Sequence, residues 1–208
     1  MEVQQHNAEV ENTGTSVFDL FRYKSLRAKA LASGLVFFGI QAIYYSTSFN
    51  LGNVGLSIYL NQAIVGVSEG IGYIAAEIAI PKVNRRKLSF IGMGLSSLLC
   101  FVLAFINTES DTGKIVSVAF LFAMRFTLCM FWAIFYVYLA EMFPTRVRSL
   151  AFGWASAIGT IGSAASPYLL HVSDLINWNS WLFPGILGGI ATICIWPLTE
   201  TFGLRLEE

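Results

Sequence analysis

The stretch LSFIGMGLSSLLCFVLAFIN, residues 88–107, carries no charged side chain and is long enough to cross a bilayer as a single helix. Five further stretches of similar length, all predominantly apolar, fill most of the remaining chain. We predict membrane spans at residues 30–50, 54–80, 88–107, 115–140, 149–171 and 181–199. The predicted fold class is therefore an all-α polytopic membrane protein, with a six-helix transmembrane domain over residues 30–199.

Composition supports this class and excludes several others. Of the 208 residues, 55% are apolar and only 12% are charged, whereas a soluble domain carries about 25% charged residues. The net charge is zero, so no electrostatic argument favours nucleic acid as a partner. The sequence has no nucleophile–base set, phosphate-binding loop or cysteine spacing typical of a metal site. We therefore expect a protein that is not an enzyme and has no cofactor or metal.

The basic residues gather at one end of the predicted bundle. Eleven of the thirteen Lys and Arg residues flank the spans on this side, and the opposite side has Lys114 alone. By the positive-inside rule, this end and both termini face the cytosol, or the matrix in a mitochondrial membrane. Such an arrangement requires an even number of spans.

The segments outside the spans are short. Residues 1–15 are polar and we predict them to be disordered. Ser16 and Asp19 resemble a capping box, which predicts an amphipathic segment over residues 16–29 in the membrane interface. Residues 200–208 form a predicted tail on the cytosolic or matrix side. No loop is long enough to hold a soluble catalytic domain.

Three ionisable side chains lie within predicted spans, namely Glu69, Glu77 and Arg125. A charge at the bilayer centre costs roughly 2.5–3.5 kcal/mol, so each should face a partner or a cavity. Glu77 is near the basic end and can reach the interface. Counted along the helices, Arg125 is about 15 Å deep and Glu69 about 22 Å deep, a gap that helix tilt could close. A structural ion pair and a role in a cavity both remain open.

Aromatic and small residues mark particular spans. Phe131 and Phe135, and likewise Trp132 and Tyr136, are four residues apart and form two adjoining stripes on one helix. Such stripes form packing surfaces, or bind cationic and flat organic molecules through ring faces. Small residues recur in the second and fifth spans and predict close helix packing there; they include Gly66, Gly70, Gly72, Gly159 and Gly162.

The segment Glu141-Met-Phe-Pro-Thr-Arg-Val-Arg148 is the most specific motif in the chain. Pro144 predicts the end of the fourth helix, because the residue before a proline disfavours helical geometry. Glu141 lies within reach of Arg146 or Arg148 across this turn, and a carboxylate near arginines can serve as a latch between conformations. The segment resembles the loop after the tenth helix in the organic cation/anion transporter family of the major facilitator superfamily. That family's pattern there is Glu-Leu-(Tyr/Phe)-Pro-Thr-x-x-Arg.

The resemblance continues in order and spacing from residue 16 to the end of the chain. Matching segments are residues 19–22, 26–27, 44–45, 50–55, 58–61, 162–168 and 198–203. They resemble helices seven to twelve, the C-terminal half of the family fold. The resemblance implies a substrate pathway lined by Asn61, Glu69, Arg125, Tyr136 and Thr160. It also implies a location in the plasma membrane and an inner gate formed by Arg85, Arg86, Glu141, Arg146, Arg148 and Glu200.

The sequence departs from the family pattern at several positions. Residues 81–86 are PKVNRR where the family has Asp-x-x-Gly-Arg-Arg, so the acid and the glycine that support the gate are missing. Thr160 is neutral where the family has a charged residue that helps to set substrate charge. Thr199 and Phe202 replace a proline and a lysine of the closing motif. The first six helices of the family fold have no counterpart in this chain.

Three hypotheses follow. The chain is a half-size carrier that forms one wall of an alternating-access pathway for small organic ions, paired with a complementary six-helix half or with itself as a homodimer. Alternatively, it is a transport-inactive structural subunit of a larger membrane complex, for example in an organelle inner membrane. A third possibility is a truncated fragment of a twelve-helix carrier. All three have the lipid bilayer as a partner and none involves nucleic acid.

Overall fold

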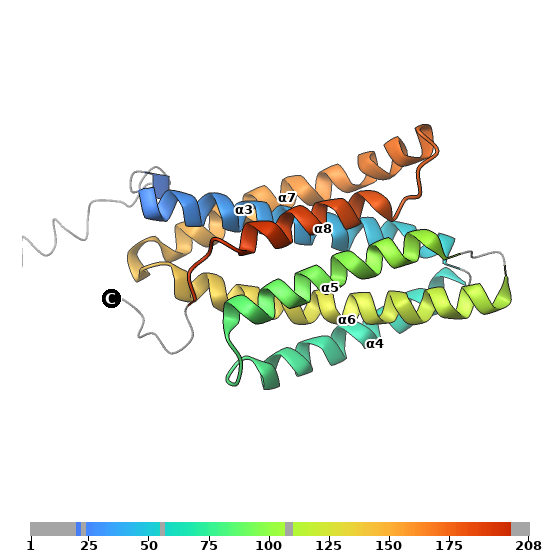
Figure 1. Ribbon diagram of the computed structural model, residues 1–208, viewed down its shortest axis with the longest axis horizontal. Helices are drawn as coiled ribbons and strands as arrows, with labels where there is room; N and C mark the ends of the chain where they lie inside the picture. The colour runs from blue at the N-terminus through green and yellow to red at the C-terminus, as the bar shows by residue number, and fades with distance from the viewer. Residues whose placement is uncertain (1–19, 22–23, 55–56, 107–109, 201–208) are drawn as a thin grey trace, which may run out of the picture.

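The computed structural model describes residues 20–21, 24–54, 57–106 and 110–200, and in these ranges it contains long helices and no β-strand (Figure 1). Each predicted span corresponds to one helix, which confirms the predicted all-α fold class. A short 3-10 turn, η1 (Asn50–Asn53), follows the first of them. The helices are α3 (Lys24–Phe49), α4 (Ile58–Ala79), α5 (Arg85–Phe105), α6 (Asp111–Met142), α7 (Thr145–Leu175) and α8 (Leu182–Ile195).

The helices differ in how apolar they are. By length and composition, three segments of the described chain could each cross a membrane alone: Leu26–Gly52, Arg85–Phe105 and Thr112–Met142. Helix α8 is apolar but shorter, at 14 residues. Helices α4 and α7 fall outside this group because charged and polar residues, together with many Gly, Ser and Ala residues, make them less apolar. Polar and small residues of this kind suit helices that line a pathway rather than face lipid.

Local chemistry explains where several helices begin and end. Ser57 Oγ accepts the backbone N–H of Leu60 at the start of α4, and Ser110 Oγ accepts that of Gly113 at the start of α6. Helix α6 ends at Met142, and Phe143 before Pro144 has extended geometry. The predicted helix end at Pro144 is thus confirmed.

Helix contacts follow a repeated pattern that relates two three-helix units of consecutive helices, α3–α5 and α6–α8, which pack mainly against each other. Helix α3 packs on α7 and α8, and α6 packs on α4 and α5 in the matching way. Helices α5 and α8 also contact each other, whereas α3 and α6 touch only lightly. Because each unit has an odd number of helices, its first helix runs opposite to that of the other unit (Figure 1). Repeats of inverted orientation are a common way to build transporter halves.

Two glycines allow the closest helix crossings. A Cβ atom at Gly72 on α4 would lie 2.8 Å from the backbone oxygen of Phe126 on α6. A Cβ atom at Gly162 on α7 would lie 2.5 Å from the backbone oxygen of Phe38 on α3. The predicted close packing is confirmed at these positions, whereas a Cβ atom at Gly66 would meet no atom of the described residues within 4 Å. Gly70 is equally open.

The chain ends are described only in part. The predicted disordered segment, residues 1–15, and residues 201–208 of the predicted tail lie outside the described residues. Of the predicted interfacial segment, residues 24–29 form the first turns of α3 itself. Leu20 is buried, and the Phe21 ring packs edge-on against Trp154 of α7 at 4.9 Å between centroids.

Candidate substrate pathway between α3, α4 and α6

A buried ion pair joins the two charged residues that the sequence singled out. Arg125 on α6 is only 1% exposed, and its Nη1 atom lies 3.2 Å from Oε1 of Glu69 on α4. Its Nη2 atom donates a hydrogen bond to Ser48 Oγ on α3. The guanidinium carbon lies 4.3 Å from the centroid of the Tyr44 ring, and the Tyr44 hydroxyl donates to Glu69 Oε2 at 3.5 Å.

This arrangement links three helices through one guanidinium group. A buried arginine is tolerated when its charge is compensated. Here a carboxylate from α4, and a hydroxyl and a ring face from α3, supply that compensation, while the Nε atom has no hydrogen-bond partner among the described residues. Packing of α4 on α6 brings the pair together despite the different depths counted along the sequence. The direct ion pair that the sequence allowed is therefore formed.

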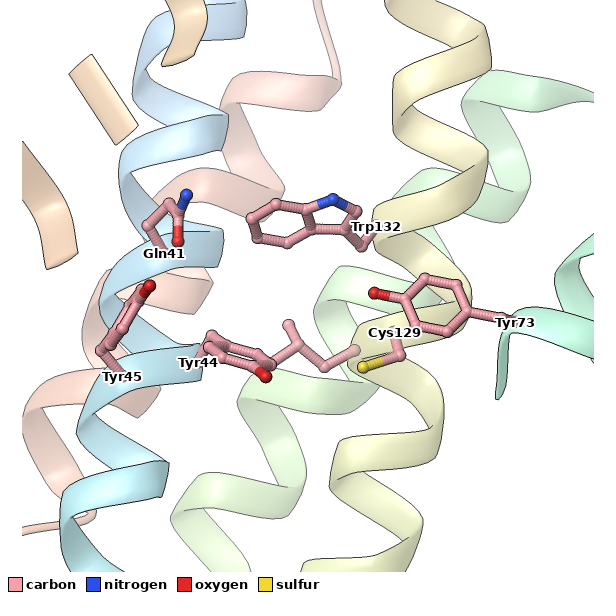
Figure 2. A pocket seen from close by; sticks show the side chains of 7 residues that line it. Gln41, Tyr44, Tyr45, Tyr73, Cys129 and Trp132 are labelled. Carbon is pink, nitrogen blue, oxygen red and sulfur yellow. The ribbon is translucent and has the colours of Figure 1, made fainter. Parts of the chain in front are cut away.

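A cavity of about 250 Å³ lies beside this ion pair, between α3, α4 and α6. Figure 2 shows the three side chains from α3 facing those from α6, with Tyr73 pointing in from α4. The Glu69 side chain is 21% exposed, so the acid of the ion pair is not sealed off. The lining residues are Gln41, Tyr44, Tyr45, Tyr73, Leu128, Cys129 and Trp132.

Most of these lining residues were not singled out as pathway residues from the sequence. Helical spacing contained a usable signal, since Tyr73 follows Glu69 by four residues and Tyr45 follows Gln41 by four. The register of α3 against α6 was the missing information. Within the described chain, no group of three or more His, Cys, Asp or Glu side chains is placed to hold a metal ion.

Ring contacts extend the aromatic lining toward the basic end of the bundle. The Trp132 and Tyr136 rings are stacked at 5.8 Å, and Tyr136 stacks in turn on Phe152 of α7 at 5.7 Å. This stripe on α6 therefore faces α7 and the cavity side. The other stripe, Phe131 and Phe135, is fully buried in the core. The two stripes therefore differ in role. Phe131 and Phe135 form a packing surface, and Trp132 and Tyr136 present ring faces to the cavity and α7.

The remaining predicted pathway residues differ in how exposed their side chains are. Tyr136 is 37% exposed beside the ring stack, and Thr160 is exposed on α7, where its hydroxyl donates to Ser156 O of the same helix. Asn61 differs from the expectation, because its side chain is fully buried and does not line the cavity. Its Nδ2 atom donates to the backbone oxygens of Leu51 and Val54, each at 2.8 Å, and so holds the α3–α4 connection.

The predicted inner gate residues lie at the basic end of α5 and α6. Arg85 Nη2 lies 3.3 Å from Glu141 Oε1, and Arg85 also donates to the backbone oxygens of Ile80 and Val83. Glu141 thus pairs with Arg85 of α5, which the predicted gate included beside the arginines across the turn. The contact forms even though the loop lacks the acid and glycine of the family pattern.

The other gate residues lie around this pair. The backbone N–H of Arg86 donates to Glu200 Oε1 at 3.5 Å, and its guanidinium donates to the Trp196 carbonyl. Arg146 is exposed on the first turn of α7. Arg148 is half-buried, and its Nε and Nη2 atoms have no hydrogen-bond partner among the residues that the structure describes.

Comparison with known proteins identifies the family. The family model described as "Sugar (and other) transporter" matches residues 1–208. The chain belongs to this transporter family. Its relatives include "Solute carrier family 22 member 16" of Xenopus laevis, 30% identical over 99% of this chain and 36% of that protein. The human protein of the same name is 31% identical over 99% of this chain and 33% of its own length.

The relatives also include a plant protein. "Organic cation/carnitine transporter 4" of Arabidopsis thaliana is 26% identical over 90% of this chain and 36% of its own length. Together these relatives confirm the resemblance to the organic cation/anion transporters of the major facilitator superfamily. The chain is therefore an integral membrane, transporter-like protein. It spans about a third of the length of the curated relatives it matches.

Proposed function

We propose that this transporter-family chain forms one wall of an alternating-access pathway for small organic ions. The observation that carries the proposal is the cavity between α3, α4 and α6, with four aromatic side chains in its lining. Ring faces attract organic cations and stack on flat organic groups. A cavity of about 250 Å³ suits a small organic ion or one end of a larger one.

The ion pair beside the cavity gives this pathway a candidate moving part. Glu69 is the accessible partner, at 21% exposed, and Arg125 is the buried one, at 1%. A cationic ligand that reaches Glu69 would compete with Arg125 for the carboxylate. Because Arg125 also contacts Ser48 and Tyr44, such competition would loosen α6 from α3 and α4 together.

The exposed faces of α4 and α7 support a second wall. Val67 and Ile74 on α4, and Ile161 and Tyr168 on α7, are each more than half exposed. No atom of the described part of the chain lies within 4 Å of a Cβ atom built at Gly66, so a helix could approach this face closely. We propose that a complementary six-helix half, or a second copy of this chain, covers these faces.

A structural, transport-inactive subunit is the second candidate, and one observation favours it. The charges of Glu69 and Arg125 compensate each other, and the hydroxyl of neutral Thr160 is used within its own helix. Under this reading the pair holds helices together and no substrate ion is bound. We further propose that the basic end faces the cytosol of the plasma membrane. The alternative is the matrix face of an organelle membrane.

Purification from native membranes followed by transport measurements separates the two candidates. The chain, together with whatever co-purifies in equal amount, is reconstituted into liposomes. Uptake of a labelled quaternary ammonium ion and of labelled benzoate is then measured. We expect uptake that Trp132→Ala lowers at least tenfold and that Trp178→Ala, at the opposite end of the bundle and outside the cavity lining, leaves unchanged.

Two outcomes contradict the carrier. Equal uptake by the Trp132→Ala and Trp178→Ala variants would refute the pathway beside α6. No uptake in any preparation, combined with co-migration in a large assembly, would support the structural subunit instead.

A further inference from the structure

A second cavity, of about 470 Å³, lies at the basic end of α5 and α8. It shares no lining residue with the cavity between α3, α4 and α6, which is called the aromatic cavity below. It is formed by the first two turns of α5 and by the chain that leaves α8. Neither α5 nor α8 contributes to the lining of the aromatic cavity. The lining residues are Asn84, Arg86, Lys87, Phe90, Ile91, Trp196 and Glu200.

Polar and apolar residues are layered by depth in this cavity. Arg86 and Lys87 belong to the first turn of α5, and Phe90 and Ile91 follow one turn further along, about 5 Å toward the middle of the helix. Ile91 is 61% exposed, and Trp196 is 65% exposed with its ring 5.6 Å from that of Phe90. Cations above an exposed tryptophan and apolar side chains match the layering of a membrane interface.

The cations are arranged to bind an anion. The Arg86 guanidinium donates one hydrogen bond to the Trp196 carbonyl and lies 5.4 Å from the centroid of the Trp196 ring. These contacts fix its position and leave further N–H donors of the guanidinium for a ligand. Lys87 is exposed at the cavity rim.

The start of α5 adds favourable electrostatics. The Asn84 side chain makes no capping hydrogen bond there, and a Glu200 oxygen already accepts from the Arg86 backbone N–H. The contact with Glu200 indicates that the N-terminal end of α5 attracts anionic oxygen atoms. Two cations and one carboxylate leave the lining with one net positive charge, which complements a single phosphodiester.

An apolar track continues from the cavity along α5. Ile91, Leu95 and Leu98 are 61%, 40% and 58% exposed and are spaced by four and three residues, so they lie on one face of the helix. Such a face can hold an acyl chain directly below a headgroup bound at Arg86 and Lys87. A soluble phosphate would make no use of this track.

We propose that the cavity at the basic end of α5 and α8 binds an anionic phospholipid, with its phosphate on Arg86 and Lys87 and its acyl chain along α5. The bound lipid bridges α5 and α8, which belong to different three-helix units. It thereby stabilises a contact on the side of the bundle away from the aromatic cavity. Lipid binding here does not require that the chain transports, although Arg86 and Glu200 also belong to the predicted inner gate.

The test uses the full chain in detergent micelles and phospholipids brominated near the headgroup, which quench tryptophan fluorescence on contact. Brominated phosphatidylglycerol should quench strongly and saturably, and brominated phosphatidylcholine weakly. Lys87→Gln should weaken phosphatidylglycerol binding about fivefold, since one lysine at an anionic surface contributes about that factor. Lys82→Gln removes an equally exposed lysine outside the cavity and should leave binding unchanged.

Three results would overturn the proposal. Equal weakening by Lys87→Gln and Lys82→Gln would indicate general surface charge rather than a site. Unchanged phosphatidylglycerol-specific quenching in Trp196→Phe would place the lipid elsewhere. Displacement of the lipid by millimolar glycerol phosphate or inorganic phosphate would indicate a site for soluble anions. An unchanged elution profile of each variant in size-exclusion chromatography excludes unfolding as the cause.

Discussion

Removing either charge of the Glu69–Arg125 pair should destabilise the protein, and by unequal amounts. Glu69→Gln leaves the Arg125 charge, 1% exposed, without a counter-charge. Removing one partner of a buried pair costs about 3–5 kcal/mol, and we expect this variant to fall in that range. Arg125→Met leaves a carboxylate that is 21% exposed and still accepts from the Tyr44 hydroxyl, so we expect a smaller loss, about 1–3 kcal/mol.

The double variant Glu69→Gln/Arg125→Met should recover most of the lost stability, because neither charge is then left alone. We expect a coupling energy of about 2 kcal/mol or more from the four proteins. Hydrogen bonds between membrane helices average only about 0.6 kcal/mol by the same measure. A value well above that figure would identify a charge pair rather than a polar contact.

The measurement is unfolding by sodium dodecyl sulfate in mixed micelles, followed by circular dichroism. Glu77→Gln is the matched control, since Glu77 is an exposed acid two turns along the same helix. We expect it to change stability by no more than about 0.5 kcal/mol. Single variants that both behave like this control, or a larger loss for Arg125→Met than for Glu69→Gln, would refute the reasoning from burial.

Three further predictions can be checked in the same unfolding assay. Gly72→Ala places a methyl group 2.8 Å from a backbone oxygen of α6 and should lower the free energy of unfolding by about 1–3 kcal/mol. The control Gly66→Ala, with open space around it, should be neutral or slightly stabilising. Equal effects of the two variants would contradict the close crossing of α4 and α6. Asn61→Leu removes two hydrogen bonds of 2.8 Å from the α3–α4 connection and should cost about 1–3 kcal/mol, whereas Asn61 in a solvated pathway would give almost none. Tyr138→Phe removes the 2.6 Å hydrogen bond from its hydroxyl to Thr199 O and should cost about 0.5–1.5 kcal/mol, while an unchanged midpoint would indicate that the chain after α8 is not held there.

Some of the candidate site was predictable from local sequence, and some was not. Glu69 and Arg125 stood out because isolated charges are costly inside a membrane, and this holds wherever the helices pack. The roles of the two aromatic stripes depended on which neighbour each one met. Phe131 and Phe135 entered the core, while Trp132 and Tyr136 turned toward the cavity and α7. Helical periodicity places residues on one face but does not say what the face contacts.

The place of Asn61 was likewise not predictable from the sequence. The resemblance to the transporter family implied that Asn61 lines the substrate pathway. Its amide instead satisfies two backbone oxygens in the short connection before α4. The requirement that buried backbone oxygens find donors decided its place, and those oxygens become buried only when the turn folds back on the helix.

The sequence by itself determined the all-α fold class, the basic end, the helix end at Pro144 and the family. These features follow from the length of apolar stretches, from charge counting and from motifs that a single segment carries. Only the tertiary structure decided that Glu69 meets Arg125, that Glu141 pairs with Arg85, and that a ring-lined cavity forms between α3, α4 and α6. Each of these depends on the crossing of helices far apart in sequence. Backbone approach at positions such as Gly72 sets those crossings, and no single helix contains that information.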